Sequence, residues 1–124
     1  MECLIQMSSK HESIKKQVMI DWSVANRGRL WSNSQYSGKV GNQYVKAGMG
    51  KGTSDLIGFE FKPFGYGKDW HIPYFCCIEV KTKSAPTIKP AQKDFLNYIS
   101  SVGGMAYIAM ETDDGYILEE WSVF

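Results

Sequence analysis

The sequence predicts a single α/β domain over residues 1–124, in which a helix and three strands precede a second helix and a further strand. Three observations support this class: a helical apolar period near the start, two apolar runs of strand length in the middle, and a second helical period followed by another apolar run. The 124 residues suit one domain, and 44% hydrophobic residues supply a core.

The first helix is predicted in SKHESIKKQVMIDWSVANRG, residues 9–28. Its apolar residues recur at spacings of four, four and three, which is the stripe of a helix with one buried face: Ile14, Val18, Trp22 and Ala25. Ser9 is placed to cap the helix and Glu12 to complete a capping box, while Gly28 is expected to end it in a left-handed conformation.

Three strands are expected next. Residues 29–36 alternate weakly and are predicted as the first, whereas residues 37–52 contain five glycines and three lysines without a clear period and predict a mobile loop. The runs TSDLIGFEF (residues 53–61) and PYFCCIEVKTK (residues 73–83) are rich in strand formers. A connection of about ten residues between them suggests a long hairpin.

The second helix is predicted to begin at Pro90, since proline suits the first helical position, and to end at Gly103. Its expected buried stripe is Phe95, Leu96, Ile99 and Val102. MAYIAME then predicts a buried strand, and Asp114 with Gly115 a turn into a last segment that the pattern leaves unassigned.

Neither the overall charge nor the cysteines of the chain indicate that it binds a polyanion or forms disulfides. Fourteen basic residues balance thirteen acidic ones, so any attraction to nucleic acid must be local. Cys3 is far from the adjacent Cys76 and Cys77, which we expect on opposite faces of a strand. No secretory signal and no apolar stretch of about 20 residues is present, so we expect a cytoplasmic protein with no membrane partner and no small-molecule cofactor.

The segment CIEVKT carries the candidate chemistry. Alternate residues of a strand share a face, so Glu79 and Lys81 point together while Ile78 and Val80 point to the packed side. If the two strands pair with Asp55 opposite Glu79, the hairpin is centred on Gly67, where a reversal is expected.

Such a register brings two carboxylates to about 5 Å, where they repel unless a cation lies between them. Oxygen ligands select a hard divalent ion, so we expect Mg²⁺ or Mn²⁺ as the cofactor. Such an ion activates water and polarises a phosphoryl oxygen, and Lys81 would orient the water or offset developing charge. The expected reaction is hydrolysis of a phosphodiester.

At this point the ordered set GTSDLIG, IEVKT, Gln92 and GGMAYIAM resembles the virus-type replication-repair nuclease (VRR-NUC) branch of the PD-(D/E)xK superfamily, from Glu12 to about Met110. The resemblance implies a restriction-endonuclease-like core, with a mixed sheet flanked by helices. Ser54 stands where the superfamily name has a proline, a substitution common in this branch.

The resemblance also assigns roles to individual residues. Catalytic residues would be Asp55, Glu79, Lys81 and Gln92; metal ligands would be Asp55, Glu79, the backbone carbonyl of Val80 and the helix acid Glu12. The substrate would be duplex or branched DNA, cut by a homodimer because symmetric cleavage needs two sites, and the source a phage-infected cell. A nuclease with exonuclease or flap preference, a non-catalytic DNA-binding or assembly subunit, and a viral interaction protein without a nucleic-acid role remain alternatives.

Structural explanations stand beside these roles. Glu79 and Lys81 could form the solvated face of a strand, and Asp55 could be a turn acid. The capping box alone would account for Glu12, and Gln92 could be a polar residue of a first helical turn.

The glycine-rich segment supplies the candidate DNA contacts. Lys39, Lys46 and Lys51, interleaved with Tyr44, could follow a DNA backbone or simply be solvated. Neither His11 nor His71 is expected as a ligand, because a hard oxygen site does not require imidazole.

Overall fold

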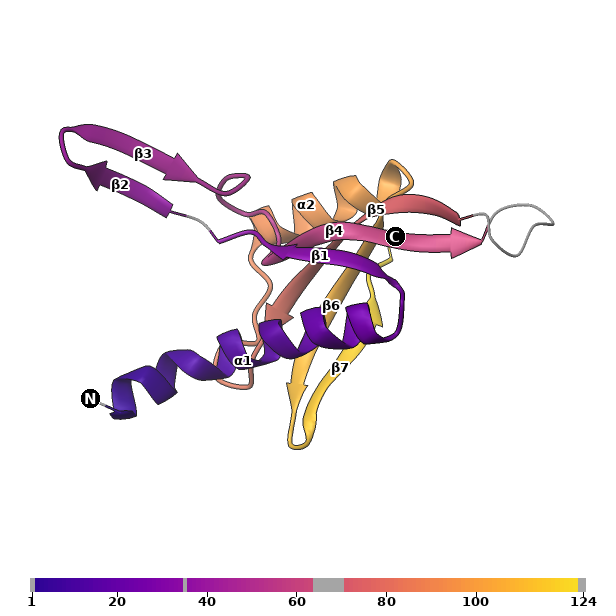
Figure 1. The fold of residues 1–124 in the computed structure, drawn as a ribbon, viewed down its shortest axis with the longest axis horizontal. Helices are drawn as coiled ribbons and strands as arrows, with labels where there is room; N and C mark the ends of the chain where they lie inside the picture. The colour runs from indigo at the N-terminus through magenta and orange to yellow at the C-terminus, as the bar shows by residue number, and fades with distance from the viewer. Residues whose placement is uncertain (1, 35, 64–70, 123–124) are drawn as a thin grey trace.

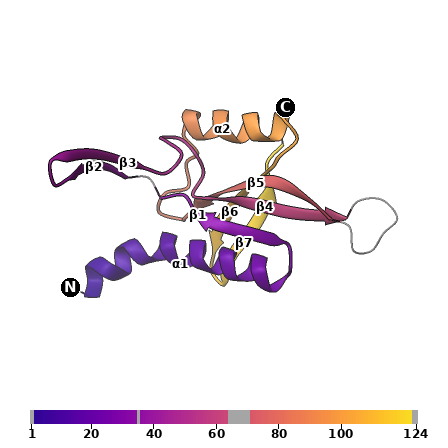
Figure 2. The same cartoon turned by 45° about the horizontal axis from the view of Figure 1, so that its top comes forward.

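The protein was analysed as a computed structural model, which describes residues 2–34, 36–63 and 71–122. It has an α/β architecture in which a five-stranded mixed sheet lies between two helices (Figures 1 and 2). The elements, in chain order, are α1 (Glu2–Val24), β1 (Gly28–Ser32), β2 (Tyr36–Val40), β3 (Gln43–Ala47), β4 (Leu56–Pro63), β5 (His71–Lys81), α2 (Pro90–Ser101), β6 (Met105–Thr112) and β7 (Gly115–Glu120).

The sheet has the strand order β1-β4-β5-β6-β7, and β5 with β6 is its parallel pair, joined through α2. Its elements therefore follow the expected order of helix, three strands, helix and strand, with β7 added at one edge. The predicted long hairpin is confirmed, because β4 and β5 are antiparallel with Leu56 opposite Ile78. Extending this pairing by one residue places Asp55 opposite Glu79. Gly67, its predicted centre, lies outside the described residues.

Each helix covers one face of the sheet. The α1 side packs Ile14, Val18 and Trp22 against strand residues that include Cys76. The α2 side packs Leu96 with Cys77, Ala106 and Ile108. The prediction that Cys76 and Cys77 face opposite ways is therefore confirmed, and both are fully buried.

The predicted beginning of the first helix is wrong. The helix α1 begins at Glu2, so Ser9 lies inside it and cannot cap it, and Glu12 does not belong to a capping box. Residues 2–8 lie beyond the apolar stripe, which starts only at Ile14. A stripe locates a buried face, and a helix can extend past the face that it buries.

The end of α1 also differs from the prediction. Asn26 adopts the left-handed conformation (φ 58°), and the N–H of Arg27 donates to the Trp22 carbonyl over 3.0 Å, which is a helix-closing Schellman arrangement. Gly28 instead begins β1, where a side chain would collide with the Phe59 carbonyl, 2.0 Å from an added Cβ. Ala25, expected in the buried stripe, is exposed beyond the helix.

The helix α2 follows its prediction more closely. It begins at Pro90 and is closed by Gly103 (φ 97°), and the N–H of Gly104 donates to the Ile99 carbonyl over 2.9 Å. Leu96 is buried, whereas Val102, expected in the buried stripe, is 65% exposed. Val102 lies at the helix terminus, beyond the last turn that packs on the sheet.

The prediction of a mobile loop over residues 37–52 is wrong for most of that segment. Strands β2 and β3 form a separate antiparallel hairpin, turned at Gly41 (φ 65°), and the hairpin projects away from the five-stranded sheet (Figure 1). A glycine with positive φ at the first position of a two-residue turn is typical of a hairpin. The hairpin was missed because five glycines interrupt this segment and leave no clear alternation of apolar and polar residues.

Neither helix, over the residues that the structure describes, has an apolar stretch of the length and hydropathy needed to cross a bilayer.

Candidate functional site

Asp55 and Glu79 meet where the hairpin of β4 and β5 ends. Asp55 directly precedes β4, and its Oδ2 accepts a hydrogen bond from the Val80 N–H over 2.8 Å. A second contact comes from α1, where His11 Nε2 lies 3.3 Å from the same oxygen. Asp55 is therefore held from both the neighbouring strand and the helix, rather than bonded to its own turn.

These contacts favour the ionised form of Asp55. Burial opposes ionisation, but the hydrogen bonds from His11 and the Val80 N–H outweigh it and hold the pKa of Asp55 below its usual range. The same hydrogen bond raises the pKa of His11. The sequence analysis did not expect His11 as a ligand and did not foresee this contact, in which the helix turns the imidazole onto Asp55.

Glu79 is in the opposite electrostatic situation. Its side chain is 4% exposed, and its Oε1 accepts a hydrogen bond from Gln92 Nε2 over 3.0 Å. The other oxygen, Oε2, is buried and has no hydrogen-bond partner in the described part of the chain. Burial and the nearby Asp55 carboxylate raise the pKa of Glu79 to about 8, and Lys81 offsets only part of this. A bound cation would stabilise a buried carboxylate oxygen that has no hydrogen-bond donor.

Lys81 and Gln92 complete the cluster. Lys81 Nζ donates to Gln92 Oε1 over 2.9 Å and lies 3.5 Å from Glu79 Oε1. Gln92 Oε1 also accepts the Lys89 N–H over 2.9 Å, so the first turn of α2 fixes the amide that holds the lysine. Lys81 and Glu79 are both buried, so they are not a solvated strand face.

Glu12 is not brought onto the two carboxylates. Its side chain is 51% exposed, and its Oε1 lies 3.3 Å from Lys15 Nζ and 4.0 Å from His11 Nδ1. Sequence reasoning missed Lys15, which is buried and also contacts Ser34. A signal was available, because His11 and Lys15 are four residues apart beside the buried stripe. His71 is exposed at the start of β5, eight positions before Glu79 in the strand.

The donor set suits a hard divalent ion. Over the described ranges, no three side chains of His, Cys, Asp or Glu converge into a metal-binding group, so a metal here would rely on two carboxylates and a backbone oxygen. The N–H and C=O of one strand residue point to the same edge, so the Val80 carbonyl faces the side on which its N–H reaches Asp55. Mg²⁺ in proteins commonly takes one or two carboxylates and keeps its other positions for water and phosphate.

This electrostatic arrangement predicts a pH-dependent stability in chelator. The pKa of Glu79 is raised from 4.5 to about 8 in the folded protein, so the folded state binds this proton more tightly than the unfolded state. The resulting contribution to the free energy of unfolding is fully present below pH 4.5 and is lost as the pH rises toward 8. We expect the free energy of unfolding to fall over this window by about 2 kcal/mol or more, since one pKa unit corresponds to about 1.4 kcal/mol. Urea unfolding between pH 5 and pH 8.5 measures the loss.

The matched variant is Glu79→Gln, which keeps the shape and removes the titration. It is expected to flatten most of the decline, leaving the smaller fall due to His11, whose raised pKa acts in the same direction. Addition of Mg²⁺ at pH 8 should restore stability to the unmodified protein and not to the variant. A decline of equal size in both proteins would show that Glu79 is not its cause.

The hairpin of β2 and β3 presents two of the candidate DNA-binding lysines together. Lys39 is directly opposite Tyr44 in the register, and Lys46 is two residues beyond Tyr44, so all three occupy one face. All three are exposed, and Lys51 is exposed in the segment after the hairpin. The sequence analysis therefore identified exposed lysines but missed the pairing of β2 and β3 that places two of them on one face.

Asn33 ties the base of this hairpin to the carboxylate cluster. Its side chain donates to Thr53 Oγ1 and to the Ser54 carbonyl, over 2.9 and 2.8 Å, and accepts the Met49 N–H over 2.9 Å. Its own N–H donates to the Asp55 carbonyl over 2.8 Å. The chain entering the hairpin is thus bonded to the chain leaving it, immediately before Asp55.

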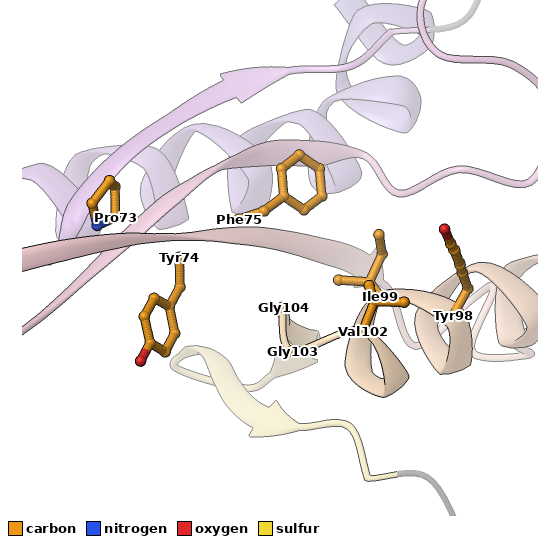
Figure 3. Close-up of a pocket in the computed structure, with 8 residues that line it drawn as sticks. All are labelled: Pro73, Tyr74, Phe75, Tyr98, Ile99, Val102, Gly103 and Gly104. Carbon is orange, nitrogen blue, oxygen red and sulfur yellow. The ribbon is translucent and has the colours of Figure 1, made fainter.

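A hollow of about 470 Å³ lies elsewhere, between the start of β5 and the end of α2 (Figure 3). Phe75, Ile99 and Val102 contribute apolar side chains to it, with Tyr74 and Tyr98 beside them. Apart from the phenols of Tyr74 and Tyr98, its lining residues carry no titratable side chain, and none of the residues of the carboxylate cluster lines it.

Comparison with known proteins gives little further information. No protein-family model and no curated protein matches the chain. A solved structure titled "Crystal structure of SSO0001" is similar, with a TM-score of 0.34 and 15% sequence identity, over 95% of this chain and 55% of that one. The chain thus spans about half the length of this neighbour. Similarity at this level assigns neither a family nor an activity to the chain.

Proposed function

We propose that the protein is a metal-dependent endonuclease of the VRR-NUC type that hydrolyses DNA phosphodiester bonds, with a preference for branched or junction DNA. One observation carries the proposal: the half-buried carboxylate of Asp55 faces the buried carboxylate of Glu79 beside Lys81, and Glu79 Oε2 has no donor in the described part of the chain. Two acids that are costly to keep together without a cation form a site for Mg²⁺ or Mn²⁺.

The arrangement of the elements supports the same proposal. The strands β1, β4 and β5 precede α2 and β6, and the carboxylates lie where β4 begins and β5 ends. This is the order that a restriction-endonuclease-like core requires. β7 and the separate hairpin of β2 and β3 would then be additions to that core.

In this proposal the metal would be held by Asp55, Glu79 and the Val80 carbonyl, and it would supply an activated water and charge for the phosphoryl oxygens. Lys81 places a buried ammonium beside those ligands, where low exposure strengthens its attraction for a phosphate in the transition state. Gln92 acts as a positioning residue, since it holds both Glu79 and the Lys81 amine.

The hairpin would provide contacts to DNA away from the cleaved bond. A two-stranded ribbon fits the major groove of duplex DNA, and lysines bind phosphates with a salt-dependent attraction. Lys39 and Lys46 lie on one face of the hairpin with Tyr44, and Lys51 follows on the connection toward Asp55. Because the overall net charge is only +1, attraction to DNA would have to come from local groupings of basic residues such as this one.

The test compares linear, flap and four-way DNA in Mg²⁺, in Mn²⁺ and in chelator, using the unmodified protein and Asp55→Ala. Cleavage is expected with either metal, with internal cuts favoured on branched DNA, and is expected to be absent in chelator and in the variant. A matched control is Asp94→Ala, which removes an exposed acid from α2.

The outcomes separate the candidate functions. DNA binding without cleavage in every metal would favour a non-catalytic DNA-binding or assembly subunit. Cleavage only from ends or at flaps would favour the exonuclease alternative. A folded protein that neither binds nor cleaves DNA would contradict a role on DNA.

A further inference from the structure

Lys15 is a buried cation on α1, one helical turn after His11. Its side chain is 6% exposed, and its Nζ lies 3.3 Å from Glu12 Oε1 and 3.3 Å from Ser34 Oγ. Hydrogen bonds from an ammonium to a carboxylate are normally about 2.7–2.9 Å long, and an ammonium has three donors. The two long contacts therefore leave Lys15 only partly satisfied within the described part of the chain.

Glu12 is a weak counterion for this lysine. Its side chain is 51% exposed, and it pairs with Lys15 across three positions of the same helix. Helix pairs of this kind contribute little when one partner is solvated. Another anion can therefore replace the Glu12 carboxylate without unpacking the buried stem of Lys15.

Two hydroxyls lie beside the ammonium. Ser34 Oγ is 2.9 Å from Ser32 Oγ, and both serines are exposed where β1 ends. A hydroxyl can donate a hydrogen bond as well as accept one. A buried ammonium with two exposed hydroxyls is a group of donors that suits an anion with several oxygens, such as a phosphate.

This group of donors adjoins the carboxylate cluster through two separate connections. Along α1, His11 Nε2 lies 3.3 Å from Asp55 Oδ2, and Lys15 follows one turn later. Along the strand, Asn33 stands between the two serines, and its N–H donates to the Asp55 carbonyl over 2.8 Å. One helical turn rises about 5.4 Å, which is of the same order as the distance between successive phosphates of a DNA strand.

We propose that Lys15, Ser32 and Ser34 form a subsite for the phosphate next to the cleaved one, and that Glu12 occupies this subsite until a DNA phosphate displaces it. The inference rests on the proposed nuclease function and deepens it, because it gives the bound strand a second anchoring point beside Asp55. Glu12 is then an internal competitor of the substrate, in place of the metal ligand that the resemblance implies.

The subsite also continues toward the hairpin of β2 and β3. The N-terminal part of α1 and this hairpin project toward the same side of the molecule (Figures 1 and 2). The two serines lie on the chain that leads from β1 into the hairpin. A strand held at Lys15 would therefore be directed from the carboxylates toward the exposed lysines of the hairpin.

The first test is the affinity for a labelled DNA duplex as a function of salt, with Ca²⁺ in place of Mg²⁺ to limit cleavage. Lys15→Met is expected to weaken binding about tenfold and to reduce the slope of log K against log salt by about one, as the loss of one phosphate contact does. The loss should be the same for duplexes of different sequence, because phosphates carry no sequence information. Lys16→Met is the matched control, because it removes the same charge from the next, exposed position of α1, and it should cost less than about twofold.

The second test is Glu12→Gln, which removes the competing carboxylate. It is expected to strengthen DNA binding about threefold in the unmodified background and less than about 1.5-fold when combined with Lys15→Met. If the pair of Glu12 and Lys15 were only structural, the loss of Glu12 would leave DNA affinity unchanged or lower it. Circular dichroism and urea unfolding check that each variant is folded, and methionine preserves the apolar stem of Lys15.

Inorganic phosphate distinguishes the DNA backbone from a free anion. At about 10 mM and constant ionic strength, it should weaken DNA binding less than about twofold, because a single phosphate lacks the other contacts of the strand. Strong displacement of DNA that depends on Lys15 would assign the subsite to free phosphate and would overturn the inference.

The remaining outcomes separate this inference from the nuclease proposal. Equal effects of Lys15→Met and Lys16→Met, or weaker binding by Glu12→Gln, would overturn the subsite, while DNA cleavage by the unmodified protein would leave the nuclease standing. If the folded, unmodified protein neither binds nor cleaves DNA, both are wrong. If it binds DNA through Lys15 and cleaves none in any metal, the subsite stands as a DNA contact and the nuclease is wrong.

Discussion

Lys81→Met is expected to lower metal-dependent DNA cleavage at least about a hundredfold, since removing one charge-stabilising group from an active site typically costs about 3–4 kcal/mol. Methionine preserves the length and apolar stem of the side chain and removes the ammonium. Lys81 Nζ lies 3.5 Å from Glu79 Oε1, so the variant also deprives Glu79 of its nearest cation. The pKa of Glu79 should rise further, and metal binding at neutral pH should weaken.

Initial cleavage rates across a Mg²⁺ titration separate these two effects. Weaker metal binding raises the Mg²⁺ concentration needed, while loss of transition-state stabilisation lowers the rate at saturating metal. Lys83→Met is the matched control, because Lys83 is exposed and pairs with Asp113 away from the carboxylates. If Lys81→Met cleaves at the normal rate while remaining folded, Lys81 is not part of the catalytic machinery.

Trp22→Ala is expected to reduce the free energy of unfolding by about 3–5 kcal/mol, a large share of the stability of a typical domain. Trp22 is 2% exposed at the centre of the core between α1 and the sheet. It packs edge-on against Tyr107 with 5.7 Å between centroids, and its Nε1 donates to the Phe59 carbonyl over 3.1 Å. Truncation would leave a cavity and remove the indole hydrogen bond to the Phe59 carbonyl.

Urea unfolding followed by circular dichroism measures this loss, with Trp31→Ala as the control. Trp31 is 45% exposed, so its truncation should cost much less than that of Trp22. Arg27 also stacks on the Trp22 ring, 4.1 Å from its centroid, and would lose this contact. Equal losses for the two tryptophans would show that the α1 core contributes less stability than its burial indicates.

The fold was predictable where one face of an element is buried. The four-residue spacing of Ile14, Val18 and Trp22 located α1, and the apolar runs located β4 and β5 with their register. The ends of α1 were not predictable in the same way. An early start at Glu2 and a left-handed Asn26 depend on backbone hydrogen bonds, which a hydropathy pattern does not report.

The candidate site divides along similar lines. Strand alternation placed Glu79 beside Lys81, and the hairpin register placed Asp55 nearby, because both follow from local geometry. The contact of His11 with Asp55 depends on how α1 is rotated and positioned against the sheet. Helix placement of this kind follows from the whole core, and the local sequence offers only the four-residue spacing of His11 and Lys15 beside the buried stripe.

In the proposed nuclease, the hydrogen bonds of Asn33 would couple DNA binding at the hairpin to metal binding at Asp55. The Asn33 side chain bonds the segment that enters the hairpin of β2 and β3 to the segment that leaves it. The Asn33 N–H donates a hydrogen bond to the Asp55 carbonyl. A duplex that reorients the hairpin would displace Asp55 with it, and any gain in cation affinity must be matched by an equal gain in affinity for the duplex. The protein would then bind its metal ion weakly until DNA is bound.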